Sequence, residues 1–248
     1  MSIALTDTSV VTDTDITTPS RPHGLLSAAH AVQIASPEWI YGGLDVETIC
    51  GGVGTSTAFC LAEGTPFTDK VPFANEWPHL EPLAVYALHE CSSIGKEWAS
   101  READALKALE IGEQTALEEH FITTASAAAE VAAAPSIAEA LFAAEDLAGY
   151  ESGRVIHLTP SNALRLSEYM TVTDGRLTTK IGTPVVVGLG YVGNLDGVLV
   201  TGTPLAVEGR AIVTDTVLER PTNLVSVLAE KPYALGYACG ATLIDVTP

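Results

Sequence analysis

Cysteine and basic residues are scarce in this sequence, and both shortages exclude kinds of protein. The 248 residues include four cysteines, Cys50, Cys60, Cys91 and Cys239, and none lies in a C-x-x-C pair. They are too few and too scattered for a disulfide scaffold, so we expect reduced thiols, as is typical of the cytoplasm. Lys and Arg number 12 against 31 Asp and Glu, a net charge of −19. Affinity for nucleic acid comes mainly from Lys and Arg at phosphates, so this balance excludes a basic DNA-reading module but not a protein that encloses DNA.

Long apolar runs and an export signal are also missing. No stretch reaches the ~18 to 20 uninterrupted apolar residues that a membrane-spanning helix needs. The first seven residues have neither the basic start nor the apolar run of a secretory signal. The composition, 47% hydrophobic and 17% charged, is that of a globular chain with a core. We therefore expect a soluble protein without membrane contact, folded as one large domain or two small ones.

The first 90 residues combine a polar segment with a glycine- and proline-rich region. Residues 1–22 are rich in Thr, Ser and Asp and cannot bury enough surface to fold alone, so they are interpreted as an arm. From Trp39 to Pro82, glycines and prolines separate short apolar stretches, which indicates strands and an extended loop. The segment 82–89 is expected to be a strand.

Two helices are predicted in the middle of the chain. Residues 96–124 contain no proline and are rich in Ala, Glu and Leu, with an apolar stripe and a start capped by Ser92 or Ser93. A second helix is predicted over 137–150, starting at Pro135 and Ser136. The predicted stripe of the first helix is Leu106, Leu109, Ala116, Leu117 and Phe121. Its acidic residues are interpreted as a solvated face, and they are Glu97, Glu102, Asp104, Glu110, Glu113, Glu118 and Glu119.

After Gly153 the sequence becomes rich in β-branched residues, with a helix-like exception at 161–169. The expected strands include 155–158, 185–187, 198–200 and 211–213, and two apolar segments, 224–228 and 233–246, end the chain. No period repeats along the sequence. The architecture expected is α+β.

The most conspicuous motif is G-x-G-x-x-G at Gly188, Gly190 and Gly193, directly after the run 185–187. In a dinucleotide site, a helix must begin at the third glycine, because its N-terminus holds the pyrophosphate. Here Gly197, Gly202 and Pro204 follow, which no helix would tolerate. We therefore interpret the glycines as turn residues between strands.

Other candidate chemistry lacks the necessary partners. His89 and Cys91 would share one face of a strand, but two ligands do not make a metal site. Cys50 and Cys60 match no common zinc spacing, and His79 has no partner in sequence. The G-x-S-x-G motif of a serine nucleophile does not occur. A carboxylate pair such as Glu118 and Glu119 would need a pocket to act as acid and base, and the sequence shows none. No catalytic, cofactor-binding or metal-binding residue is predicted, and no cofactor.

The order of elements, an acidic arm, an extended loop, a long helix, a second helix, a β-rich insert and closing strands, resembles the major capsid proteins of tailed bacteriophages, the Hong Kong 97 fold. Residues 96–124 resemble the spine helix of that family. The passage 137–166 resembles the part of that family's sequence in which a helix is followed by a strand and a proline. The passage 181–187 resembles its "G-x-P-V-V-V" strand. Residues 223–246 resemble its closing strands, and the style of the sequence is similar to capsid proteins of phages that infect actinobacteria.

The resemblance implies an N-terminal arm (1–44), an extended loop with the first peripheral strands (45–90), a spine helix with the peripheral domain (91–151), an axial domain (152–222) and C-terminal peripheral strands (223–248). It implies a non-enzymatic shell subunit of a virion, assembled in the bacterial host cytoplasm around double-stranded DNA that it does not bind sequence-specifically. Its partners would be copies of itself in hexamers and pentamers, with scaffolding, portal and decoration proteins as further candidates. The alternatives are an encapsulin-type compartment, another phage structural protein such as a tail subunit, and, last, a dinucleotide-binding enzyme.

Overall fold

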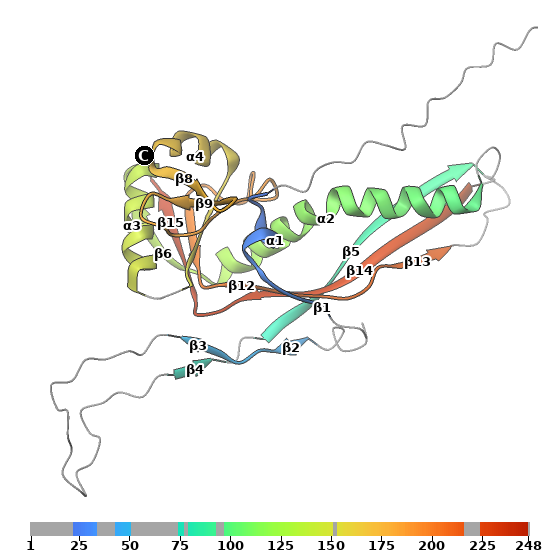
Figure 1. The fold of residues 1–248 in the computed structure, drawn as a ribbon, viewed down its shortest axis with the longest axis horizontal. Helices are drawn as coiled ribbons and strands as arrows, with labels where there is room; N and C mark the ends of the chain where they lie inside the picture. The colour runs from blue at the N-terminus through green and yellow to red at the C-terminus, as the bar shows by residue number, and fades with distance from the viewer. Residues whose placement is uncertain are drawn as a thin grey trace, which may run out of the picture.

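One long helix, α2 (Trp98–Ala128), extends through most of the molecule and packs against both of its main sheets (Figure 1). The computed structural model describes residues 22–33, 43–50, 74–76, 79–92, 97–150, 153–215 and 224–247. Residues 1–21 of the expected arm and residues 51–73 of the expected loop lie outside these residues.

The sequence of α2 explains its length and its buried side. It lacks proline and is rich in Ala, Leu and Glu, which have high helix propensity. The alanine-rich stretch that follows Thr124 continues the helix by one turn. Glu97 occupies the N-cap without a side-chain hydrogen bond, so the expected cap at Ser92 or Ser93 is wrong: Ser92 is the last residue of a strand.

The buried residues of α2 follow a helical repeat of four. They are Arg101, Ala105, Leu109, Leu117, Glu118, Phe121, Ile122 and Ala125. Leu106 is 39% exposed, and Ala116 is exposed, so the predicted stripe was right at Leu109, Leu117 and Phe121 and wrong at these two positions.

The larger sheet has six strands and supports the first two thirds of α2. Its order is β1-β12-β14-β5-β2, with β13 also paired to β14. β5 and β14 are antiparallel over twelve residue pairs, so they form the long axis of the sheet. The bounds are β1 (His30–Gln33), β2 (Leu44–Asp45), β5 (His79–Ser92), β12 (Pro204–Glu208), β13 (Ile212–Asp215) and β14 (Leu224–Tyr237).

One face of this sheet packs against α2. Val85 of β5 and Val227 and Ala229 of β14 are buried there together with Leu109 and Leu117 of the helix. The apolar segments expected at 224–228 and 233–246 are not two separate elements. The first belongs to β14, which continues without a break through Tyr237.

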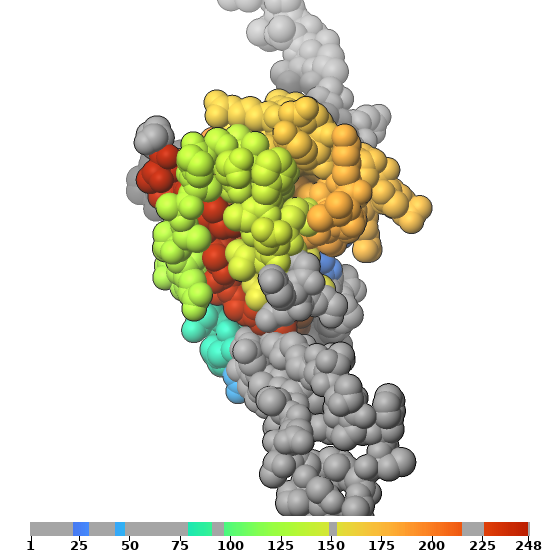
Figure 2. All heavy atoms as spheres, turned by 90° about the vertical axis from the view of Figure 1, so that its left-hand side faces the viewer, coloured from blue at the N-terminus to red at the C-terminus, as the bar shows by residue number. Residues whose placement is uncertain are grey.

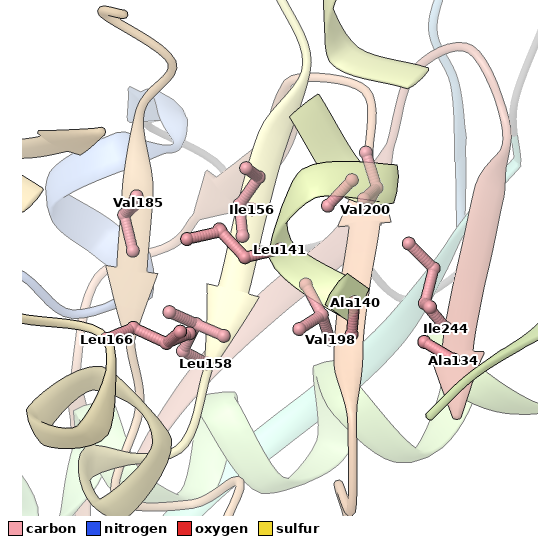
Figure 3. Packing of buried hydrophobic residues seen from close by; sticks show 11 residues of the cluster. Ala134, Ala140, Leu141, Ile156, Leu158, Leu166, Val185, Val198, Val200 and Ile244 are labelled. Carbon is pink, nitrogen blue, oxygen red and sulfur yellow. The ribbon is translucent and has the colours of Figure 1, made fainter. Parts of the chain in front are cut away.

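The smaller sheet has five strands, in the order β10-β7-β11-β15-β6. Helix α3 (Ile137–Tyr150) covers one face, where Ala140 and Leu141 lie over Ile156 and Val200 (Figure 3). The helix starts where predicted, and Ser136 Oγ accepts a hydrogen bond from the backbone N–H of Glu139 at 3.2 Å. The strands are β6 (Glu130–Ala134), β7 (Val155–Leu158), β10 (Val185–Val187), β11 (Val198–Thr201) and β15 (Ala241–Val246).

The other face of the five-stranded sheet is covered by the C-terminal end of α2 and by a short helix, α1 (Leu25–Ala28). Leu25, Phe121 and Ile122 pack there against Val186 and Leu199. The predicted strands at 155–158, 185–187 and 198–200 are thereby confirmed. Smaller elements complete the fold: α4 (Pro160–Arg165), the 3-10 helix η2 (Ser167–Tyr169), the hairpin β8 (Met170–Thr173) and β9 (Arg176–Thr179), and the pair β3 (Thr48–Cys50) and β4 (Ala74–Glu76).

The boundaries expected from the sequence do not follow the sheets. β12 and β13 lie within 152–222 but belong to the six-stranded sheet, whereas β15 lies within 223–248 but belongs to the five-stranded sheet. The reason is that the chain crosses between the sheets, and the turn after β14 carries it from one to the other. The described part of the expected arm, 22–33, is built into the fold as α1 and β1.

Cys239 is disulfide-bonded, so the expectation of reduced thiols is wrong for this residue. Sequence spacing did not reveal this bond. The side chains of the other three cysteines lie outside the described part of the chain. Among the described residues, no helix has the length and apolarity needed to cross a membrane.

We expect Gly112→Ala to stabilise the protein by about 0.5 to 1 kcal/mol, because glycine inside a helix costs backbone entropy. Gly112 lies in the middle of α2, and an added Cβ meets no atom within 4 Å. Urea unfolding of the unassembled chain measures the change. The reciprocal control, Ala116→Gly on the exposed side of the same helix, should lower stability by a similar amount, and a loss of stability in Gly112→Ala would contradict the packing described here.

Candidate functional site

A buried carboxylate joins three separate parts of the chain. Glu118 of α2 is 0% exposed. Its Oε1 accepts hydrogen bonds from the backbone N–H of Leu25 at 3.3 Å and from Gln114 Nε2 at 2.9 Å, and its Oε2 accepts one from the backbone N–H of Gly190 at 3.2 Å. A buried charge is tolerated when hydrogen bonds replace its lost hydration. Glu118 therefore fixes the start of α1 and the glycine loop on the long helix.

This placement overturns the interpretation of Glu118 and Glu119 as a solvated pair. Only Glu119 is exposed. The position of Glu118 next to Leu117, on the buried stripe of the helix, was the sequence signal that could have identified it.

The glycine motif lets its loop pack closely against α2. A Cβ on Gly190 would overlap the backbone oxygen of Thr115 and the backbone nitrogen of Glu119, so only glycine lets the loop lie directly on α2. A Cβ on Gly188 would meet the ring of Tyr191 at 2.8 Å. Residues 191–194 form turns, and β11 follows at Val198, which confirms the interpretation as turns between strands.

A second group of buried polar side chains lies beside Glu118. His157 of β7 is 0% exposed, with its Nδ1 3.0 Å from Tyr191 Oη and its Nε2 2.8 Å from Thr201 Oγ1. Thr201 Oγ1 gives its only proton to the carbonyl of Gly202 at 2.8 Å. His157 Nε2–H must therefore donate to Thr201, and Nδ1 accepts from Tyr191. This pattern is complete when the imidazole is neutral.

Burial decides the ionisation of both rings. It lowers the pKa of His157 from 6.5 to about 3. Burial, and after it the negative charge of Glu118, raises the pKa of Tyr191 well above its ordinary value. Phe121 of α2 packs on the imidazole with ring centroids 5.2 Å apart. The group is thus a neutral, fully bonded part of the core, suited to holding elements together.

A partly buried ion triad joins α2 to the six-stranded sheet. Lys231 Nζ of β14 lies 2.8 Å from Glu113 Oε1 of α2 and 2.8 Å from Glu208 Oε2 of β12. Burial alone would lower the pKa of Lys231, but hydrogen bonds to Glu113 and Glu208 outweigh it, so the pKa is raised. Glu113, like Glu118, does not belong to a solvated face.

Of the metal candidates, the structure describes the side chains of His79 and His89, which contact different carboxylates. His89 Nε2 lies 3.7 Å from Asp104 of α2, and His79 Nδ1 lies 2.7 Å from Asp45, each a two-residue contact. Within the described residues, no three His, Cys, Asp or Glu side chains are close enough to hold a metal ion.

Two surfaces carry exposed apolar side chains. On the six-stranded sheet, the face opposite α2 presents Tyr86, 66% exposed, and Leu88, 54% exposed, with Ile212 at 41% nearby on the same face. At the far end of the five-stranded sheet, Leu164, Val172 and Ile181 are 60 to 77% exposed. Grouped exposed apolar residues of this kind mark contact surfaces more often than isolated ones do.

Comparison by sequence finds no relatives: no family model matches the chain, and no curated protein matches it. Comparison by structure finds many. The capsid of an empty GTA particle matches at 11% identity over 94% of this chain and 92% of that chain, with a TM-score of 0.59. A chain of Mycobacterium phage Adephagia matches at 12% identity over 95% and 94%, with a TM-score of 0.54, and one of Microbacterium phage Oxtober96 at 13% over 94% and 94%, with 0.53.

These likenesses cover nearly the whole chain and establish its fold. The GTA neighbour is a capsid chain, and this chain shares its α+β fold, the Hong Kong 97-type capsid fold that the sequence predicted.

We expect Glu118→Gln to destabilise the chain by about 1 to 3 kcal/mol, since an amide NH₂ would face a backbone N–H that now donates to a carboxylate oxygen. The matched control is Glu119→Gln, an exposed neighbour on the same helix, for which a change within about 0.5 kcal/mol is expected. Chemical unfolding measures both, and equal effects would contradict the role given to Glu118.

The lowered pKa of His157 predicts that the folded protein loses stability as the pH falls, and that this loss begins at pH values well above those at which carboxylates titrate. In the unfolded chain the imidazole takes up a proton below pH 6.5, but in the folded chain only near pH 3, so its contribution is present above pH 6.5 and is lost as the pH falls. One such group should cost about 2 kcal/mol between pH 7 and pH 5. Urea unfolding at several pH values should show this slope, flattened in His157→Gln and kept in His120→Gln; an unchanged slope in His157→Gln would contradict it.

Proposed function

We propose that this protein is a structural subunit that assembles with copies of itself into an icosahedral head shell, which encloses the double-stranded DNA of a tailed phage. The observation that carries the proposal is the fold. It is shared over 94% of the chain with a GTA capsid determined with C5 symmetry.

The exposed apolar surfaces support a chain that works by contact with copies of itself. Tyr86, Leu88 and Ile212 are exposed together on the face of the six-stranded sheet that is opposite α2. In a closed symmetric assembly, one such surface is buried in every copy, so a small set of contacts is repeated many times. We propose that the arm 1–44 and the loop within 45–80 contribute further contacts between subunits.

The charge fits a container for DNA. With a net charge of −19, the chain offers few Lys and Arg for counterion release at phosphates. Glu97, Glu110 and Glu119 remain exposed along α2. A lining of this kind would let DNA enter and leave without adhering.

The proposed role is structural and not enzymatic, with no cofactor. The subunits would form hexamers and pentamers, with scaffolding, portal and decoration proteins as possible further partners. The location would be the virion, after assembly in the cytoplasm of the bacterial host.

Negative-stain electron microscopy of the purified protein, with its mass from light scattering, tests the proposal. A closed shell of ~60 copies of this 25.9 kDa chain would weigh about 1.6 MDa or more. We expect hollow round particles of at least this mass, or rings of five and six subunits. Nuclease-protected DNA in particles from phage-producing cells would distinguish a head shell from a compartment.

Other outcomes favour the alternatives. Hollow particles that hold protein cargo and no DNA would favour an encapsulin-type compartment. Tubes or stacked rings would favour a tail subunit. A monomer that binds a nicotinamide dinucleotide in calorimetry would overturn the structural proposal.

A further inference from the structure

An apolar groove of about 640 Å³ opens at the end of the molecule that carries α4 and the β8–β9 hairpin. Its walls include Ala163 and Leu164 of α4, Met170 and Val172 of β8, Leu177 of β9 and Val187 of β10. In Figure 2 the gold and orange residues of this region project beyond α3. Leu164 and Val172 are 77% and 60% exposed, so the groove is open.

The hairpin directs its apolar face into this groove. Val172 pairs with Leu177 and Met170 pairs with Thr179, and cross-strand partners share a face. A two-stranded hairpin is marginally stable in water unless this face is packed. The groove is therefore a surface that an additional segment would stabilise.

The N-terminal segment enters the described structure next to this groove. The carbonyl of His23 accepts a hydrogen bond from the backbone N–H of Val187 at 2.8 Å, and Val187 also lines the groove. Leu25, two residues on, is held by Glu118. The chain N-terminal to His23 thus starts at the groove wall, and residues 1–21 could reach up to about 70 Å when extended.

The composition of residues 1–21 suits the groove. The segment contains the β-branched residues Ile3, Val10, Val11 and Ile16, which favour an extended strand in an apolar cleft. It carries three aspartates against one arginine. Residues 160–187 have the opposite balance, three basic residues against two acidic ones, and Arg165, Arg176 and Lys180 are exposed. In a chain of net charge −19, this stretch has a small excess of basic residues, which complements the acidic segment.

We propose that residues 1–21 dock into the groove of their own chain, with the apolar residues around Val11 and Ile16 against Met170, Val172 and Leu177. The segment then serves as an additional strand-like cover for the hairpin, and its outward side remains available to neighbouring subunits. This inference goes beyond the shell proposal and does not depend on it.

Photo-crosslinking of the full-length chain tests the docking. The probe is p-benzoylphenylalanine in place of Val11 or Ile16, and the adducts are located by protease digestion and mass spectrometry. We expect adducts mainly within residues 160–187. A refolded equal mixture of ¹⁵N-labelled and unlabelled chains shows whether the two linked peptides come from one chain.

Two variants provide a matched comparison. The double variant Leu164→Asp with Val172→Asp changes two exposed groove residues, so the fold should survive, and we expect at least a five-fold loss of adduct. Val192→Asp changes an equally exposed apolar residue, 62% exposed, outside the groove and should leave the yield unchanged.

Adducts between equally labelled peptides in the groove, lost in the double variant, would support the proposal. The proposal would be overturned by adducts elsewhere or by the absence of adducts. It would also be overturned by linked peptides of mixed labels, which would mean that a second copy of the chain occupies the groove. The readout is independent of shell formation, so its failure is distinguishable from failure of the shell proposal.

Discussion

The carboxylate of Glu118 is the constraint on which the arrangement of the rest depends. Its three hydrogen-bond donors come from α1, from α2 itself and from the glycine loop that follows β10. Remove the carboxylate and two backbone N–H groups lose their partners in a place without water. Because α2 also packs on the six-stranded sheet, both sheets are positioned relative to this one helix. The neighbouring His157 group adds a second junction, between β7, β11 and the same loop.

Local features of the fold were readable from the sequence. The long helix lacks proline, and α3 begins at a capping serine. Strands β7 and β10 are apolar runs between turn residues. Periodicity and turn chemistry are therefore enough to locate these elements in the sequence. The rest depends on distant pairing. Whether a glutamate on a helix is solvated or buried follows from what lies against it, and Glu118 and Glu119 differ only in this respect. The glycine motif was correctly interpreted as turns between strands, yet only the structure shows that Gly190 is required by contact with α2.

The domain boundaries show the same limit in another form. A capsid-like order of elements could be recognised along the chain, but β12 and β15 each join the sheet that their position in sequence does not suggest. Contacts between distant parts of the chain are not visible in the sequence, and an example is Lys231 of β14, whose two glutamates lie on α2 and β12.

The pairing of β5 with β14 has a mechanical consequence. Their ladder extends over twelve residue pairs along the long axis of the subunit. Tension along that axis loads many of these hydrogen bonds at once in shear, whereas tension across it would open them one after another like a zip. A subunit built this way resists stretching best along its length. In the proposed shell, internal pressure would therefore be carried most safely with the long axes of the subunits in the plane of the wall.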